Sequence, residues 1–274
     1  MSSVGAPGTT VRVTLGQLRV HADRATNRAT VVDAFAAAAG EHADLLVLPE
    51  YTSAFDPRGV GPEHAEPLTG PFVETLRAQA ERTGLAVIAG TTLPGASAGR
   101  AVNAVVAIDP AGELVGVYRK VHLYDAFGTR ESDRLEPGPA DAPPLVLDVA
   151  GLRFGVLTCY DLRFPESARR VVDAGADVLV VPAAWAAGER KELHWRSLAV
   201  ARAIENTSVV VAVGQAGPGV VGRSLVVGPD GVVDLELGAD PEIGSVDLDP
   251  ARIARERERN PSIRNRRYTT VPLP

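Results

Sequence analysis

The segment His42-Ala-Asp-Leu-Leu-Val-Leu-Pro-Glu50 is matched later in the chain by Gly175-Ala-Asp-Val-Leu-Val-Val-Pro-Ala183. Each is a short apolar run that ends at a proline, a pattern typical of a buried strand followed by a turn. Short apolar strands resemble one another by chance, so one match alone does not indicate duplication. Whether the chain repeats itself depends on the elements that come after the two copies.

The same order of elements succeeds both copies. Each is followed by a predicted helix, by a strand, and later by a strand-turn-strand unit. These units are Val102 to Tyr118 around Asp109-Pro-Ala-Gly112, and Arg223 to Leu237 around Gly228-Pro-Asp-Gly231. Agreement over several elements favours duplication. Two similar halves predict two packed sheets with helices outside, a four-layer α-β-β-α sandwich.

Apolar runs of strand length alternate with helical stretches throughout the chain, which predicts an α/β fold. Strands are expected at Val11 to Val20, Leu45 to Leu48, Leu85 to Ala89, Val102 to Ile108, Leu114 to Tyr118, Leu145 to Val149, Leu152 to Leu157, Val178 to Val181, Ser208 to Val213, Leu225 to Val227 and Val232 to Leu237. Helices are expected at Ala22 to Ala39, Pro71 to Thr83, Pro165 to Ala174, Lys191 to Asn206 and Pro250 to Arg259. We expect a flexible N-terminus over residues 1–10 and a single domain over residues 11–274, because α/β folds of this length commonly form one domain.

Composition excludes several classes of protein. Hydrophobic residues make up 45% and charged residues 23%, which is ordinary for a globular protein. The net charge is -6 and the basic residues are dispersed, so no nucleic-acid partner is expected. No apolar run approaches the roughly 18 residues needed to cross a membrane. Residues Met1 to Thr10 lack the features of a signal peptide, so a cytoplasmic location without a membrane partner is expected.

Cys159 is the only cysteine, which excludes an internal disulfide and a cysteine-based metal cluster and fits a reducing compartment. It ends the apolar run that begins at Leu152 and precedes Pro165, which is expected to open a helix. A junction between strand and turn can hold a nucleophile exposed and rigid. A lone cysteine is more often an inert core residue, however. A free thiol has a pKa of about 8.5, so a nucleophilic Cys159 needs a base or a cation beside it.

Glu50 and Lys120 could supply that base and that cation, because each follows a predicted strand. The first copy of the repeat ends in Glu50 and the second in Ala183, so a carboxylate stands in one half only, as expected of an active site. A carboxylate can take the thiol proton, and a lysine can stabilise an oxyanion together with a backbone N–H, for which we expect that of Tyr160. Solvated residues at strand ends are the alternative interpretation.

These residues resemble the nitrilase superfamily of carbon–nitrogen hydrolases over about Val11 to Arg267. The matching pieces are Leu-Pro-Glu50, Tyr-Arg-Lys120-Val-His-Leu-Tyr-Asp, Glu131-Ser-Asp and Cys159-Tyr-Asp-Leu-Arg-Phe-Pro-Glu166. The resemblance implies a sandwich of the nitrilase type, a homodimer, and no cofactor or metal. It also implies Glu50 as general base, Lys120 as oxyanion stabiliser, Cys159 as the nucleophile of a thioester mechanism, and Glu131 as a second glutamate that positions substrate or lysine.

The residues after the cysteine are similar to those of the Nit-type amidases, which include ω-amidases and deaminated-glutathione amidases; true nitrilases usually carry Cys-Trp-Glu there. In that branch the arginine matching Arg163 is implicated in holding a substrate carboxylate, and the tryptophan near Trp185 lines the pocket. On charge spacing alone, Arg163 could instead pair with Glu166 or Asp161. Trp185 and Trp195 could both be core residues. The stretch Gly214 to Gly222 is shorter than in many relatives, which leaves the shape of the pocket open.

The sequence thus predicts an amidase that acts on a small, carboxylate-bearing amide and releases ammonia. Alternatives are nitrile or N-carbamoyl hydrolysis, and a catalytically silent scaffold or thiol sensor. Intact Glu50 and Lys120 speak against a scaffold, and the missing second cysteine speaks against a sensor. Gly217-Pro-Gly-Val-Val-Gly222 matches a dinucleotide fingerprint but leads into a strand, not a helix. The histidines lack zinc spacing, and a structural hydrogen bond is expected for His122.

Overall fold

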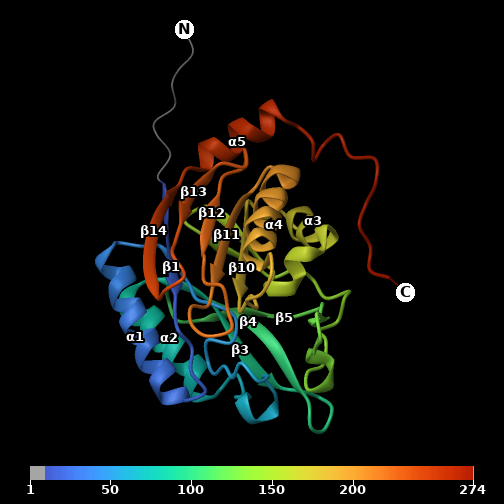
Figure 1. The fold of residues 1–274 in the computed structure, drawn as a ribbon. Helices are drawn as coiled ribbons and strands as arrows, with labels where there is room; N and C mark the ends of the chain where they lie inside the picture. The colour runs from blue at the N-terminus through green and yellow to red at the C-terminus, as the bar shows by residue number, and fades with distance from the viewer. Residues whose placement is uncertain (1–9, 274) are drawn as a thin grey trace.

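In the computed structural model, which describes residues 10–273, two six-stranded sheets stack with helices on both outer sides (Figure 1). The first sheet has the order β14-β1-β2-β3-β4-β5 and the second the order β13-β12-β11-β10-β9-β8. The first comprises β1 (Val11–Gln17), β2 (Leu45–Val47), β3 (Ala86–Pro94), β4 (Ala101–Ile108), β5 (Leu114–Arg119) and β14 (Glu242–Leu248). The second comprises β8 (Val146–Val149), β9 (Leu152–Val156), β10 (Val178–Ala183), β11 (Val209–Gly214), β12 (Leu225–Val227) and β13 (Val233–Glu236). Apart from Thr10, the N-terminus expected to be flexible lies outside the described residues.

The two sheets are built alike, which confirms the duplication. From β14 to β5, neighbouring strands pair antiparallel, parallel, parallel, antiparallel and antiparallel. The same series runs from β8 to β13. Both predicted strand-turn-strand units, β4 with β5 and β12 with β13, are antiparallel hairpins. The connectivity differs at one edge only, where β14 comes from the C-terminal part of the chain while β8 directly precedes β9.

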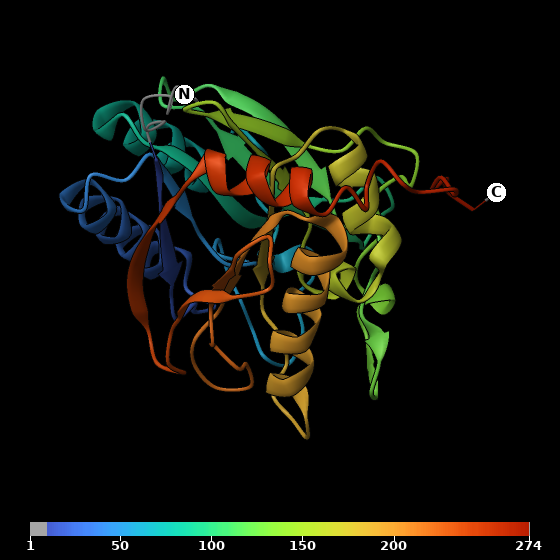
Figure 2. The same ribbon diagram turned by 90° about the horizontal axis from the view of Figure 1, so that it is seen from above.

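Helices cover both outer faces, as the four-layer prediction requires. In Figure 2, α1 (Arg24–Gly40) and α2 (Pro71–Thr83) lie on one side of the stacked sheets, and α3 (Pro165–Asp173) and α4 (Lys191–Asn206) on the other. A further helix, α5 (Pro250–Arg259), follows β14. Proline stands at the start of α2, α3 and α5, where its fixed φ suits a helix and its missing N–H costs nothing.

Three apolar layers hold the sandwich together. Leu45 and Val47 of β2 point into the layer between the two sheets, whereas Leu46 and Leu48 pack against α1 and α2. In β10, likewise, Val178 and Val180 face the other sheet, and Leu179 and Val181 face α3 and α4. Strands buried on both faces have unbroken apolar sequences, which is why these runs lack alternation.

The sequence missed strand β14 and a small hairpin. In β14, Glu242 and Asp247 interrupt the apolar residues, because an edge strand carries polar side chains on its accessible positions. The hairpin of β6 (Asp125–Ala126) and β7 (Thr129–Arg130) is too short to leave a periodic signal. Three short 3-10 helices were also not expected: η1 (Pro62–His64), η2 (Glu131–Asp133) and η3 (Cys159–Arg163).

Candidate active site

The turn that carries Cys159 is held in an unusual backbone conformation. Cys159 opens η3 just after β9, with a φ of 46° that residues other than glycine seldom adopt. On its N-terminal side, the Thr158 hydroxyl donates to Pro182 O at 2.8 Å. The Thr158 N–H donates to Asp161 Oδ2 at 3.1 Å. A strained residue persists only where its surroundings enforce it, and such residues cluster at functional sites.

Glu50 follows β2 and is buried, with donors on both carboxylate oxygens. Oε1 accepts hydrogen bonds from Asn103 Nδ2 at 2.6 Å and from Lys120 Nζ at 3.0 Å. Oε2 accepts one from the backbone N–H of Ala184 at 2.6 Å. Ala184 follows the second copy of the repeat, so one half of the duplication supplies the carboxylate and the other supplies a donor to it. These three donors hold the Glu50 carboxylate in one orientation.

Lys120 follows β5 and is buried between two carboxylates. Its Nζ lies 3.0 Å from Glu50 Oε1 and 2.9 Å from Glu131 Oε2. Burial alone would lower the pKa of Lys120, but the negative charges of Glu131 and Glu50 outweigh it and raise that pKa well above the ordinary value. Lys120 is therefore an ammonium ion over the whole physiological pH range.

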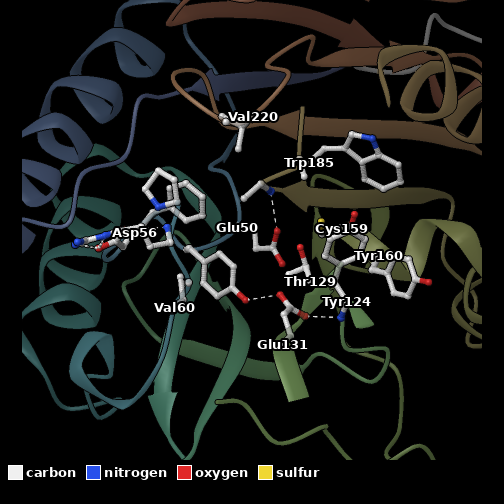
Figure 3. Close-up of a pocket in the computed structure, with 18 of the residues that line it drawn as sticks. Glu50, Asp56, Val60, Tyr124, Thr129, Glu131, Cys159, Tyr160, Trp185 and Val220 are labelled. Carbon is white, nitrogen blue, oxygen red and sulfur yellow. Dashed lines mark hydrogen bonds and ion pairs between the residues drawn. The ribbon is translucent and has the colours of Figure 1, made fainter. Parts of the chain in front are cut away.

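Glu131 reaches the site from η2, directly after the small hairpin. Its Oε1 accepts a hydrogen bond from the Tyr51 hydroxyl at 2.8 Å, and its Oε2 accepts one from the Tyr124 N–H at 2.6 Å (Figure 3). As sequence, Glu131 is one carboxylate in a polar loop. In the structure it is a fixed partner of Lys120, because the hairpin folds the loop back over the end of β5.

The thiol of Cys159 is buried, and its surroundings favour the protonated form. Burial raises the pKa of Cys159, the charge of Glu50 raises it further, and the charge of Lys120 lowers it; the net direction is well above the ordinary value. The resting nucleophile is thus a protonated thiol, not a preformed thiolate.

Glu50, Glu131 and Cys159 together line a pocket of about 470 Å³. Figure 3 shows Tyr160 and Trp185 on the Cys159 side of this pocket, with Asp56 and Val60 on the other side of Glu50. Residues from both halves of the duplication meet here. A pocket of this size suits a small molecule.

Arg163 lines the same pocket and pairs with neither acid proposed for it. Asp161 instead binds His122, whose Nδ1 lies 2.8 Å from Oδ1, so the hydrogen bond expected for His122 is present. The Arg163 guanidinium lies 4.8 Å above the Trp185 ring, and its Nη2 lies 3.3 Å from His194 Nδ1. Its Nε is buried without a hydrogen-bond partner among the described residues. Such a group can bind an anionic group of a ligand.

The two tryptophans differ in their surroundings. Trp185 is buried yet lines the pocket, and its indole N–H donates to the backbone oxygen of Lys191 at 2.9 Å. Trp195 is fully buried in the layer beneath α4, so for this residue the core interpretation was right.

Sequence reasoning missed several polar residues that lie at the site. These residues are Tyr51, Asn103, Tyr124, Lys191 and Gln215. Asn103 could have been noticed as the single polar residue in the apolar run Ala101 to Ile108. Gln215, whose side chain donates to the backbone oxygen of Glu50 at 2.6 Å, stands in the loop whose shape the sequence left open.

The part of the chain that the structure describes has neither a membrane-spanning helix nor a metal-binding cluster. No helix among residues 10–273 is long and apolar enough to cross a bilayer. Within the same residues, no group of three or more His, Cys, Asp or Glu side chains could hold a metal ion.

Comparison with known proteins gives consistent matches over nearly the whole chain. The family model described as carbon-nitrogen hydrolase matches residues 12–258. A deaminated glutathione amidase of Escherichia coli O157:H7 is 37% identical over 263 residues, which cover 95% of this chain and 99% of that protein. An omega-amidase of Xenopus laevis is 30% identical over 266 residues, which cover 93% and 95% of the two chains.

A solved structure shares the fold. The crystal structure of an amidase from Nesterenkonia sp. is 29% identical, has a TM-score of 0.80 and matches over 97% of both chains. In a mutant of the amidase from Nesterenkonia sp. AN1, the acetamide moiety of fluoroacetamide is covalently added at the active-site cysteine.

Proposed function

Since this chain belongs to the carbon-nitrogen hydrolase family, we propose that Cys159, Glu50 and Lys120 are the catalytic residues with which it cleaves a small amide. The chain is an amidase, a hydrolase of carbon–nitrogen bonds other than peptide bonds. One observation carries the assignment of the three residues: Glu50 and Cys159 line the same pocket, and Lys120 Nζ lies 3.0 Å from Glu50 Oε1. The covalent adduct on the cysteine of the Nesterenkonia amidase supports the choice of nucleophile.

In the first step, Glu50 takes the thiol proton of Cys159 as the sulfur bonds to the amide carbon. The carbonyl electron pair moves to the oxygen, and the Lys120 ammonium and the backbone N–H of Tyr160 donate hydrogen bonds to this oxyanion. The carbon–nitrogen bond then breaks as Glu50 returns the proton to the nitrogen. Ammonia leaves and a thioester remains.

In the second step, Glu50 takes a proton from water as the water oxygen bonds to the thioester carbon. The carbon–sulfur bond breaks, and the thiol of Cys159 regains its proton. The net reaction consumes one amide and one water and yields one carboxylic acid and one ammonia. Glu131 touches Lys120 and holds its ammonium at the oxyanion position, which makes Glu131 a positioning residue in this scheme.

We further propose that the substrate carries a carboxylate that Arg163 binds. The guanidinium lines the pocket without an acidic partner among residues 10–273, although such partners are common elsewhere on this chain. The Escherichia coli and Xenopus laevis relatives are named for a deaminated glutathione and an omega-amide activity, which also suggests amides of acids.

A panel of substrates tests this function through ammonia release. The panel contains monoamides of dicarboxylic acids, uncharged amides of equal length, nitriles and N-carbamoyl amino acids, with Cys159→Ala as the blank. We expect the monoamides to be hydrolysed with the highest kcat/KM. Faster turnover of nitriles or N-carbamoyl amino acids would replace the amide assignment by the corresponding alternative.

We also propose that the protein is a homodimer and that it is located in the cytoplasm. The family resemblance supports the dimer, and three exposed apolar side chains of the C-terminal segment, Tyr268, Val271 and Leu273, could be covered by a second copy. The single cysteine supports a reducing compartment. Light scattering on the purified protein and fractionation of the source cells test these two points.

A further inference from the structure

Lys191 is a pocket residue that the proposed mechanism does not use. The chain carries 28 lysines and arginines, yet Lys120 and Lys191 are its only lysines. Both have a buried ammonium at this site, Lys120 between the two glutamates and Lys191 in the lining of the pocket. In a chain that otherwise uses arginine for its permanent positive charges, a lysine at this place calls for a specific explanation.

The ammonium of Lys191 is held in place by aromatic residues. Lys191 opens α4, and its Nζ donates a hydrogen bond to the Tyr124 hydroxyl at 2.7 Å. The same nitrogen lies 3.6 Å from the centre of the Phe127 ring and 5.0 Å from that of Tyr124. Cation–π contacts and one neutral acceptor compensate a buried charge only in part.

Other basic residues of the pocket have acidic partners. Arg58 pairs with Asp56, Arg134 with Glu63 and Arg130 with Asp133. Within residues 10–273, no carboxylate lies within ion-pair distance of Lys191 or Arg163. The unpaired positive charge is therefore concentrated at one end of the pocket.

Lys191 and Arg163 share this end. The Arg163 guanidinium lies 5.6 Å from the centre of the same Phe127 ring. Burial, and then the positive charge of Arg163, lower the pKa of Lys191. Two unpaired cations repel each other, and an anion placed between them would reduce that repulsion.

The sum of the charges at the site also favours an anionic substrate. The site holds three basic side chains, Lys120, Lys191 and Arg163, and two carboxylates, Glu50 and Glu131, while Cys159 is a neutral thiol. The site carries one positive charge in excess, which one substrate carboxylate neutralises. We propose that Lys191 and Arg163 bind the substrate carboxylate jointly, which makes Lys191 a specificity-determining residue; this inference rests on the function proposed above.

The test compares two substrates of equal length, the monoamide of glutaric acid and the uncharged pentanamide. Lys191→Met removes the charge, and Lys191→Arg keeps it. Arg196→Met is the matched control, because Arg196 lies on the same helix, is exposed and pairs with Glu236 away from the pocket. Lys191→Gln, whose amide can still contact Tyr124, replaces the Met variant if that variant does not fold.

For Lys191→Met we expect the KM of the glutaric monoamide to rise roughly tenfold or more, as for the loss of a charged hydrogen bond, with kcat little changed. The kinetics of pentanamide should stay the same, Lys191→Arg should keep most of the preference for the acid, and Arg196→Met should keep all of it. An equal loss with both substrates would overturn the inference, because Lys191 would then only support the fold.

The wild-type enzyme separates the two levels of the proposal. If the wild type does not prefer the glutaric monoamide to pentanamide, the proposed carboxylate-bearing substrate is wrong. The role of Lys191 in binding that carboxylate is then wrong as well. If the wild type prefers the acid and Lys191→Met keeps that preference, the inference alone is wrong.

A pH profile gives a second readout that a purely structural role would not produce. The groups that face Lys191 are Arg163, His194 beyond it, Tyr124 and Cys159. Because the pKa of Lys191 is lowered, its charge is lost at a lower pH than for an ordinary lysine, so the KM of the acid should rise on the alkaline side. In Lys191→Arg this rise should disappear, and its persistence there would count against the assignment.

Discussion

The Tyr118 hydroxyl donates a hydrogen bond of 2.7 Å to the buried carboxylate of Asp161, and this bond ties the strand that precedes Lys120 to the turn that carries Cys159. Asp161 also accepts hydrogen bonds from the backbone N–H groups of His122 and Thr158. Two of the proposed catalytic residues are thus positioned by one carboxylate that itself touches neither the substrate pocket nor the reacting atoms.

Tyr118→Phe should lower kcat more than it raises KM, because the Cys159 turn loses a tie to β5 while the pocket lining stays intact. The free energy of unfolding should fall by about 1 to 3 kcal/mol, because the buried Asp161 carboxylate loses one of its hydrogen-bond donors. Steady-state kinetics and denaturant unfolding check both effects. Asp161→Asn should lower kcat further, and a Tyr118→Phe variant with wild-type kcat would show that this tie does not position the nucleophile.

Gly90→Ala should damage the site through the backbone of Glu50. A Cβ at Gly90 would lie 2.5 Å from the Pro49 carbonyl oxygen and 2.7 Å from the Tyr51 nitrogen. Overpacking of this kind costs about 1 to 3 kcal/mol and would displace the Glu50 carboxylate. Thermal unfolding and kcat/KM should both decline. The control is Gly40→Ala at the end of α1, where a Cβ meets nothing within 4 Å, and equal behaviour of the two variants would contradict the prediction.

Glu50→Gln should fold and lose most of its activity, since the amide is nearly isosteric but cannot take the thiol proton. In the wild type, Lys120 and Asn103 donate to one carboxylate oxygen of Glu50 and the Ala184 N–H donates to the other. The NH₂ group of glutamine would replace one of these oxygens and meet a donor instead of an acceptor. We therefore also expect a modest loss of stability. Rapid-quench detection of the thioester is the decisive measurement. Acylation at the normal rate would mean that Glu50 is not the base.

Titration of the single cysteine tests the protonation state of the nucleophile. Because burial and the charge of Glu50 raise the pKa of Cys159, the thiol should stay protonated at neutral and mildly alkaline pH, and thiolate should form only above the usual range. Ultraviolet thiolate absorbance reports this directly, with Cys159→Ala as the blank because no other cysteine contributes. A thiolate signal at neutral pH would show that Cys159 is a preformed thiolate and would contradict the prediction.

Arg163→Lys should selectively weaken the binding of acids. Lysine keeps the charge but loses the planar fork that fits a carboxylate, so the change should cost about 1 to 3 kcal/mol for an ω-amide acid. An uncharged amide of equal length should be little affected, and comparison of kcat/KM for the two substrates provides the measurement. If kcat/KM falls equally for both substrates, Arg163 only holds the loop in place, and the proposed preference for a carboxylate-bearing substrate is wrong.

The sequence by itself determined the architecture and the chemistry. Strands such as β2 and β10 are recognisable because burial on both faces leaves an unbroken apolar run, and their repetition in the same order predicted two similar sheets. Glu50, Lys120 and Cys159 could be selected because each stands at or just beyond the end of a predicted strand. These are local patterns, readable within a window of about ten residues.

The tertiary structure alone decided which side chains meet. Lys120 contacts Glu131 because the hairpin of β6 and β7 turns the loop back, and Asn103 reaches Glu50 because β4 lies beside β3 in the sheet. The Ala184 N–H meets Glu50, 134 residues away in sequence, only because the two sheets stack face to face. The pairing of Lys191 with Tyr124 likewise joins the second half of the chain to the first. Contacts of this kind depend on how the layers pack, and no periodicity along the chain records that packing.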